Sequence, residues 1–144
     1  MHRSSFIAAA AAVAALAAGL PLAAAAQDGT KKTRVVVQVS DADPARWNLA
    51  LNNVRNLQQD LGADNVTVEV VAYGPGIGML KLDSAVGSRI SEALKSGVKV
   101  SACENTMRGQ KLTHADMLPN VGYVPAGVVE IIQRQQEGWA YLRP

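Results

Sequence analysis

Cys103 is the only cysteine of the chain, and it directly follows the predicted strand from Val98 to Ala102. The residues after it, from Glu104 to Gly109, have the composition of a short helix. Backbone N–H groups at a helix start and a nearby cation such as Arg108 both stabilise a thiolate, the nucleophilic form of cysteine. Cys103 is therefore a candidate nucleophile assisted by Arg108. The alternative, equally consistent with its position, is a buried and inert side chain at a strand end.

The single cysteine also limits other kinds of chemistry. Apart from His2, His114 is the only histidine. These side chains are too few for a metal site of Cys and His ligands within one chain, and one cysteine excludes an intramolecular disulfide. We predict neither a metal nor a cofactor. His114 could act as a base for the thiol because imidazole changes charge near neutral pH, but its context favours a surface position on a short helix.

Three glycines, Gly74, Gly76 and Gly78, follow a second predicted strand. Glycine lets a backbone approach a ligand closely, and ordinary turn chemistry explains the same spacing equally well. The segment lacks the Gly-Lys-Ser/Thr ending of a phosphate-binding loop. Because it should lie at the same rim as Cys103, we include the three glycines as candidate binding residues.

The spacing of apolar and turn residues predicts five strands separated by helices. The expected strands cover residues 34–39, 65–72, 98–102, 121–124 and 139–142, and the expected helices cover 44–61, 84–95, one or two short pieces of 104–118, and 125–136. Asp43 before Pro44 is typical of an N-cap followed by proline at the first helical position. Such alternation predicts a three-layer α/β/α domain over residues 33–144, with a five-stranded, mainly parallel sheet of general flavodoxin-like form. Ligands and chemistry would then lie beyond the carboxyl ends of the strands.

The last two elements carry an expectation about packing and assembly. The helix at 125–136 contains four aliphatic side chains that we expect to point into the core: Val128, Val129, Ile131 and Ile132. The closing strand at 139–142 is apolar for an edge strand, which would favour aggregation unless another subunit covered it. The sequence therefore predicts a homo-oligomer.

Residues 1–26 have the order of a secretory signal. An uninterrupted apolar stretch runs from Phe6 to Ala18, and Ala24-Ala25-Ala26 supplies an A-x-A cleavage site. The alternative, a membrane anchor, needs about 20 strongly apolar residues, whereas this run is mostly alanine and is followed by Gly19 and Pro21. We predict cleavage near residue 26, a flexible tail at 27–32, a periplasmic or secreted location, and no membrane association after cleavage.

Charge and aromatic content exclude one class of partner. The formal net charge of the whole chain is +2 and becomes +1 without Arg3. The aromatic residues beyond the signal are too scattered for a base-stacking platform. We therefore expect no nucleic-acid partner.

Several motifs in order resemble the DsrE/DsrF-like family. The most specific is a strand ending in Gly-Val-x-Val-x-x-Cys at Cys103, followed by Asn105-Thr106-x-x-Gly. Val-Ser-Asp-Ala-Asp-Pro at 39–44, Val-Ala-Tyr-Gly-Pro-Gly at 71–76 and Val-Pro-Ala-Gly-Val-Val-Glu-Ile at 124–131 extend the resemblance over nearly all of residues 32–144. The resemblance implies a three-layer fold, assembly into trimers or hexamers, and a persulfide on Cys103 that is passed to a partner. Asn105 and Thr106 become candidate binding residues beside it.

Three functions remain open from the sequence. In the first, Cys103 is a persulfide carrier of sulfurtransferase-like type, with a sulfur donor and acceptor that the sequence does not name. In the second, the chain is a non-enzymatic oligomeric module that binds a small ligand or partner, and Cys103 only packs. In the third, Cys103 senses oxidants through a sulfenic acid. An exported thiol works without cytosolic reductants, which favours inorganic or small-molecule sulfur in the first case.

Overall fold

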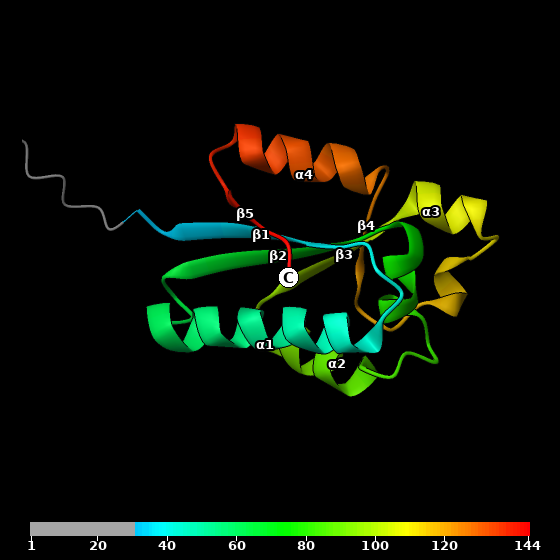
Figure 1. Cartoon of the computed structure of the whole chain (residues 1–144), viewed down its shortest axis with the longest axis horizontal. Coiled ribbons are helices and arrows are strands. Elements are labelled where there is room, and N and C mark those ends of the chain that lie inside the picture. The colour runs from blue at the N-terminus through cyan, green and yellow to red at the C-terminus, as the bar shows by residue number, and fades with distance from the viewer. Residues whose placement is uncertain (1–30) are drawn as a thin grey trace, which may run out of the picture.

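The protein is described by a computed structural model that covers residues 31–144 (Figure 1). The predicted signal at 1–26 and most of the predicted tail at 27–32 lie outside the described residues. The elements in chain order are β1 Thr33–Val39, α1 Pro44–Leu61, β2 Val66–Ala72, the 3-10 helix η1 Gly74–Leu80, α2 Gly87–Lys95, β3 Lys99–Cys103, α3 Glu104–Gly109, the 3-10 helix η2 His114–Asp116, β4 Gly122–Val124, α4 Gly127–Gln136 and β5 Ala140–Leu142.

The strands form a single five-stranded sheet in the order β4-β3-β2-β1-β5. All four pairings between named strands are parallel. Helices α1 and α2 cover one face of the sheet and α4 covers the other, as Figure 1 shows. The predicted three-layer α/β/α architecture is confirmed, and α3 lies beyond the carboxyl ends of the strands. No helix of residues 31–144 has the length and apolar character needed to cross a membrane.

Local sequence signals account for the boundaries of α1. The Asp43 side chain accepts a hydrogen bond of 2.8 Å from the Ala45 N–H, which satisfies one of the free donors of the first turn. Pro44 occupies the first helical position, where it has no N–H to lose. The helix ends at Gly62, whose φ of +87° favours glycine. The predicted cap and helix are therefore confirmed.

The two faces of the sheet differ in chemistry. Alternate residues of β2, such as Val68 and Val70, join a large apolar core under α1 and α2. On the α4 face the apolar cluster is small and consists of Val36, Val71 and Ile131, with Tyr73 and Trp139 packed against it. This face also carries two buried polar side chains. Glu69 and Ser101 are both 0% exposed.

The expectation for the inward face of α4 is wrong for three of its four residues. Ile131 is buried, whereas Val128, Val129 and Ile132 are about half exposed. The inward stripe instead follows the i, i+3, i+4, i+7 spacing through Gly127, Glu130, Ile131 and Arg134. The physical reason is the polar character of the sheet face that α4 covers. The buried Glu69 on this face requires a cation, so hydrophobicity alone does not decide which residues of α4 point inward.

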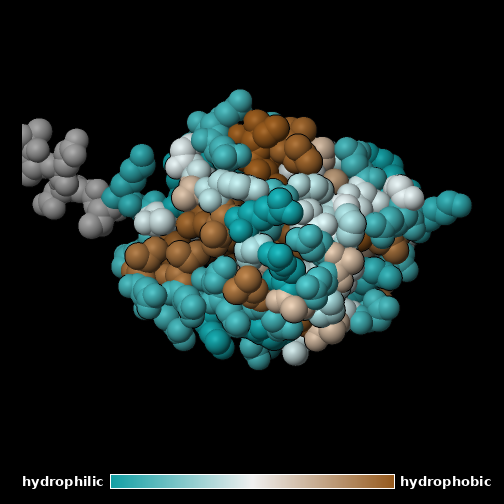
Figure 2. All heavy atoms as spheres, viewed as in Figure 1, coloured by the Kyte–Doolittle hydropathy of each residue, from teal (hydrophilic) through white to brown (hydrophobic). Residues whose placement is uncertain are grey.

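Apolar side chains gather at the surface over α4, where Figure 2 shows a hydrophobic area at the top of the molecule. Val128, Val129 and Ile132 are exposed there. The closing strand β5 lies at the edge of the sheet, as expected, and its Tyr141 is 43% exposed. These features leave one apolar helix face and one sheet edge without cover from the described residues of the same chain.

Candidate functional site

Cys103 occupies the junction of two elements. It is the last residue of β3 and the N-cap of α3, so its side chain lies where the carboxyl end of the strand meets the first turn of a helix. Its side chain faces α4, because Sγ lies 3.2 Å from the Gly127 nitrogen at the start of that helix. The residue is only 4% exposed. The sequence placed this residue at the correct strand end, and the structure adds that it is enclosed.

Polar groups from two elements act on the Cys103 sulfur. The Gly127 N–H at the start of α4 donates to Sγ over 3.2 Å. From α3, the Thr106 hydroxyl and the backbone N–H groups of Thr106 and Asn105 also favour the thiolate over the thiol. The Asn105 N–H additionally donates to Pro125 O at 3.2 Å, which ties α3 to the loop before α4. Such an array favours a negative charge on sulfur.

A backbone contact determines how the Thr106 hydroxyl is used. The Gly74 N–H donates to Thr106 Oγ1 over 2.8 Å. A hydroxyl has one hydrogen and two lone pairs, so accepting from Gly74 leaves its single hydrogen for another acceptor. The Thr106 hydroxyl also lowers the pKa of the Cys103 thiol, which is the effect of a donor that stabilises the thiolate. Thr106, expected as a binding residue, is thus a hydroxyl group that η1 orients and that favours the thiolate.

These contacts lower the pKa of Cys103. Burial of the side chain acts in the opposite direction and would raise the pKa, since it disfavours the thiolate. The Thr106 hydroxyl and the N–H groups of Gly127, Thr106 and Asn105 together outweigh burial, and the pKa of the thiol falls below its usual value. Cys103 therefore combines low exposure with an environment that stabilises its nucleophilic form.

Gly127 was missed as a site residue when the sequence was interpreted. A Cβ at this position would lie 2.9 Å from the Tyr73 Cβ and 3.3 Å from the Cys103 Cβ. Only glycine brings the helix backbone near enough for its N–H to reach the sulfur. The signal that could have identified it is the glycine in Val124-Pro125-Ala126-Gly127, next to a helix start. Tyr73, which closes the same contact, was likewise not among the candidate site residues.

The three candidate glycines have separate roles. Gly74, with a φ of +54°, presents its N–H to Thr106. Gly76 is buried, and a Cβ there would lie 2.2 Å from the carbonyl oxygen of Val39, so this glycine allows η1 to pass the end of β1. A Cβ at Gly78 would lie 3.3 Å from the ring of Trp47. Gly74 therefore acts at the site, whereas Gly76 and Gly78 are packing positions.

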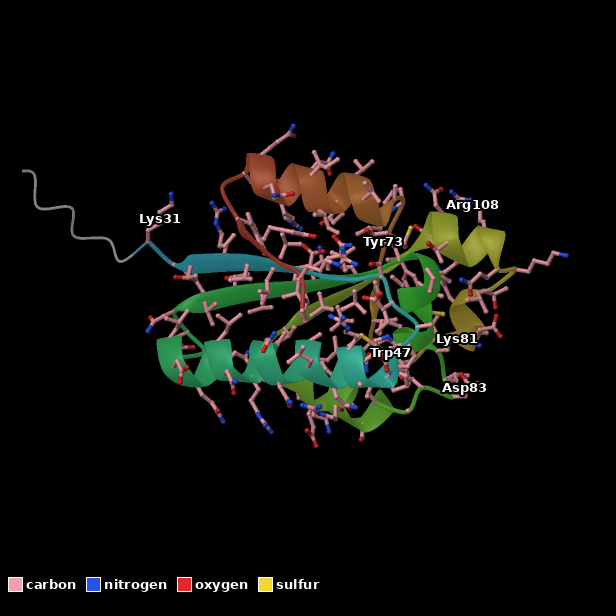
Figure 3. All side chains as sticks on the ribbon, in the orientation of Figure 1. Lys31, Trp47, Tyr73, Lys81, Asp83 and Arg108 are labelled. Atoms are coloured by element: carbon pink, nitrogen blue, oxygen red, sulfur yellow. The ribbon has the colours of Figure 1, made fainter. Side chains whose placement is uncertain are left out.

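Arg108 and Asn105 form a pair on α3. The Arg108 guanidinium donates to Asn105 Oδ1. Figure 3 shows Arg108 at the outer surface of α3 and Tyr73 near the carboxyl end of the sheet. Arg108 is exposed on α3, and the groups that lower the pKa of Cys103 most are the Thr106 hydroxyl and the backbone N–H groups of Gly127, Thr106 and Asn105.

His114 lies on the surface, as the sequence favoured. Its ring stacks on Tyr123 with centroids 3.6 Å apart, and its Nε2 is 3.8 Å from a Glu104 carboxylate oxygen. The imidazole is 61% exposed. His114 is engaged with these neighbours and contributes no hydrogen bond to the Cys103 thiol.

A buried charge cluster lies on the same face of the sheet as Cys103. Glu69 accepts hydrogen bonds from Ser101 Oγ at 2.8 Å and from Arg134 Nε at 2.6 Å, and Lys99 Nζ lies 3.3 Å from it. Burial raises the pKa of Glu69, but these partners outweigh it and hold the pKa below its usual range. The sequence analysis did not find this cluster. Within residues 31–144 no group of three or more His, Cys, Asp or Glu side chains could hold a metal ion.

Comparison with known proteins agrees with this geometry. A sequence profile of the DsrE/DsrF-like family matches residues 6–144. The chain belongs to the DsrE/DsrF-like family. A solved structure of a protein of unknown function from Methanobacterium thermoautotrophicum is 43% identical, with a TM-score of 0.74, over 78% of this chain and 99% of that one.

Two further structures share the fold of this family member at low identity. A conserved protein of unknown function from Bacteroides thetaiotaomicron is 12% identical, with a TM-score of 0.64, over 77% of this chain and 94% of the other. The ychN protein of E. coli is 12% identical, with a TM-score of 0.60, over 78% and 99%. No curated protein matches the chain. Membership of the family suggests a sulfur-relay role in general terms.

Proposed function

We propose that the protein is a sulfur carrier in which Cys103 holds a sulfane sulfur as a persulfide. The observation that carries this proposal is the Gly127 N–H that donates to the Cys103 sulfur, together with the groups of Thr106 and Asn105 that lower the pKa of the thiol. A packing cysteine has no need of them. A nucleophile that must be a thiolate before it attacks, and again when it leaves, benefits from them in both steps.

The chemistry balances without an external oxidant or reductant. The Cys103 thiolate attacks the outer sulfur of a donor R–S–SH, forming Cys–S–SH, and the electron pair of the broken S–S bond leaves with R–S⁻. An acceptor thiolate R′–S⁻ then attacks the outer sulfur, giving R′–S–SH and regenerating the Cys103 thiolate. The donors around Sγ stabilise the leaving thiolate of this second step. The low exposure of Cys103 favours small persulfides and inorganic polysulfide as donors.

Intact-mass analysis of the purified protein after exposure to polysulfide tests the proposal. We expect a gain of one sulfur atom that is removed by a reducing thiol and that does not form in Cys103→Ser. A variant of the surface histidine, His114→Gln, is the matched control and should gain the same mass. A Cys103 that stays unmodified and also resists alkylation would refute the carrier function.

Low exposure supports a second candidate, the non-enzymatic binding module in which Cys103 packs. The 4% exposed side chain lies among Tyr73 and Gly127 and would serve that purpose too. The same mass measurement separates the alternatives, since a packing cysteine gains nothing. A redox-sensing cysteine would instead gain one oxygen atom on exposure to peroxide and no sulfur from polysulfide.

We also propose that copies of the chain assemble through the outer face of α4 and the edge strand β5. Exposed Val128, Val129 and Ile132 on the helix and half-exposed Tyr141 on the edge support this surface. Light scattering after size exclusion should give a trimer or hexamer for the wild type and a smaller species for Ile132→Asp. A monomeric wild-type protein would contradict this assembly.

The proposal also includes export of the protein. The alanine-rich stretch and A-x-A site within residues 1–26 support removal of the segment during secretion. Mass analysis of the N-terminal peptide from secreted or periplasmic material should show a chain that begins near residue 27. A cytosolic protein that retains Met1 would contradict this location.

A further inference from the structure

Helix α4 touches the sheet through one stripe with two polar anchor points. At its first residue, the Gly127 N–H reaches Cys103 Sγ. Seven residues later, Arg134 binds the buried Glu69, and Ile131 packs between the two anchors. Seven residues of helix span about 10 Å. The two contacts are therefore joined by a short rigid rod.

The Gly127 end of this rod is held by backbone contacts. Val124 of β4 pairs with Cys103 of β3, and the Asn105 N–H donates to Pro125 O at 3.2 Å. Gly127 itself has no side chain, and the next two residues, Val128 and Val129, are half exposed. The apolar cluster beneath the helix is small, with Val36, Val71 and Ile131 at its centre. The start of α4 is thus held in place, whereas the direction of the helix axis, which aims the Gly127 N–H, also depends on a contact farther along the helix.

The Arg134 end is held strongly. Arg134 Nε lies 2.6 Å from Glu69 Oε2, and the guanidinium lies 4.7 Å from the centre of the Trp139 ring. Glu69 is 0% exposed and has Ser101 as a further donor. Separating a buried carboxylate from its cation leaves an uncompensated buried charge, which is strongly unfavourable. Arg134 is thus confined to one place on the sheet.

We propose that Glu69 and Arg134 are positioning residues for Cys103, which act through α4 by holding the Gly127 N–H against the sulfur. The inference deepens the carrier function proposed above and rests on it for its biological meaning. Ser101 connects the two sites within the sheet, because it binds Glu69 and lies two residues before Cys103 on the same face of β3. The pair controls thiol reactivity without touching the sulfur.

Direct electrostatics and positioning predict opposite results for one substitution. Glu69→Gln removes a negative charge, and by electrostatics alone this change lowers the pKa of a nearby thiol. Loss of positioning raises that pKa, since the thiolate loses the Gly127 donor. The charged and titratable groups on the elements around Cys103 and α4 are Arg34, Glu69, Tyr73, Lys99, Glu104, Arg108, Tyr123, Glu130, Arg134 and Glu137. The charges of these groups predict only the lowered thiol pKa, whereas a raised thiol pKa follows only from the loss of positioning.

A second variant keeps the positive charge at position 134 and removes the geometry of its contacts. Arg134→Lys retains a cation but loses the planar guanidinium that binds Glu69 and stacks on Trp139. Arg89→Lys is the matched control on the opposite face, because Arg89 binds Asn48 and Asn52 and links α2 to α1. All three proteins are compared with the wild type by circular dichroism, which identifies any variant that does not fold.

The measurement is the pH dependence of Cys103 alkylation by iodoacetamide in the purified protein. We expect the thiol pKa to rise by about half a unit in Glu69→Gln and in Arg134→Lys, and to be unchanged in Arg89→Lys. If Glu69→Gln does not fold, Arg134→Lys alone decides. A lowered or unchanged pKa in the folded variants, or an equal rise in Arg89→Lys, overturns the proposal.

The two proposals fail separately in this design. Alkylation requires no sulfur donor, so the thiol pKa responds to positioning whether or not Cys103 carries a persulfide. A protein that gains no sulfur yet shows the expected pKa shifts refutes the carrier function alone. A protein that gains sulfur normally and shows no pKa shift in either variant refutes the positioning role alone.

Discussion

Replacing Thr106 with valine removes one hydroxyl group and nearly preserves the shape of the side chain. In the structure this hydroxyl accepts from the Gly74 N–H at 2.8 Å, and it lowers the pKa of the Cys103 thiol. Thr106→Val therefore deprives the thiolate of a donor and the Gly74 N–H of an acceptor. The first loss acts on the pKa of Cys103, and the second acts on the stability of the fold.

The size of both effects follows from the contacts. A hydrogen bond to a charged group contributes about 1.5–3 kcal/mol, and sulfur is a weak acceptor, so the lower end applies. One pKa unit corresponds to about 1.4 kcal/mol, and the thiol pKa should rise by about one unit. The partly buried Gly74 N–H left without an acceptor should lower the free energy of unfolding by about 1 kcal/mol.

Alkylation rates across pH make the change visible. Below both pKa values, the variant has about one tenth of the thiolate of the wild type, but each thiolate is about threefold more nucleophilic because nucleophilicity increases with pKa. Thr106→Val should thus react about threefold more slowly at low pH and about threefold faster above both pKa values. The two pH profiles should cross.

Thr106→Ser is the control, since it keeps the hydroxyl and should retain the wild-type pKa of Cys103. Urea unfolding of both variants measures the cost at Gly74. If the valine and serine variants share one thiol pKa, the hydroxyl does not stabilise the thiolate and the reasoning from Gly74 through Thr106 to Cys103 is wrong.

Three further predictions concern single contacts. Gly127→Ala places a Cβ 2.9 Å from the Tyr73 Cβ. It should lower the free energy of unfolding in urea by about 1–3 kcal/mol and raise the pKa of the Cys103 thiol. Wild-type values for both quantities would contradict the close approach. Gly76→Ala places a Cβ 2.2 Å from the Val39 carbonyl oxygen, so we expect little soluble folded protein, and a wild-type melting temperature would show that the segment adapts. Because the folded-state pKa of Glu69 is lowered, its charge adds stability that is fully present above its unfolded pKa of about 4.3 and is lost as pH falls through the folded value. Urea midpoints between about pH 2 and 6 should therefore fall more steeply in the wild type than in Glu69→Gln, and identical slopes would refute the assignment.

Local patterns explain why most of the fold could be predicted. The Asp43-Pro44 pair and Gly62 mark the ends of α1 by interactions within a few residues. Apolar runs such as that from Val66 to Ala72 are typical of strands covered on both faces. The predicted strand end at Cys103 was correct for the same reason, and the parallel topology then brings this residue to the edge where α3 begins.

The arrangement around the thiol was beyond the reach of local patterns. The hydrogen bond from Gly127 to Cys103 joins residues 24 apart, that from Gly74 to Thr106 joins residues 32 apart, and that from Arg134 to Glu69 spans 65. No spacing rule within one helix or strand encodes such pairs. For this reason the sequence predicted that the aliphatic residues of α4 point inward. In the structure Arg134 points inward instead, because it binds the buried carboxylate beneath the helix.

The sequence by itself determined the five strands and the main helices, the three-layer fold and the identity of the one residue with nucleophilic chemistry, because these depend on periodicity, caps and side-chain type. Only the tertiary structure decided which groups surround the sulfur. Arg108, the neighbour expected to assist Cys103, binds Asn105 instead. Backbone N–H groups and one hydroxyl, brought together from α3 and α4, stabilise the thiolate. The physical reason is that a helix backbone approaches a buried sulfur only where glycine and long-range packing allow it.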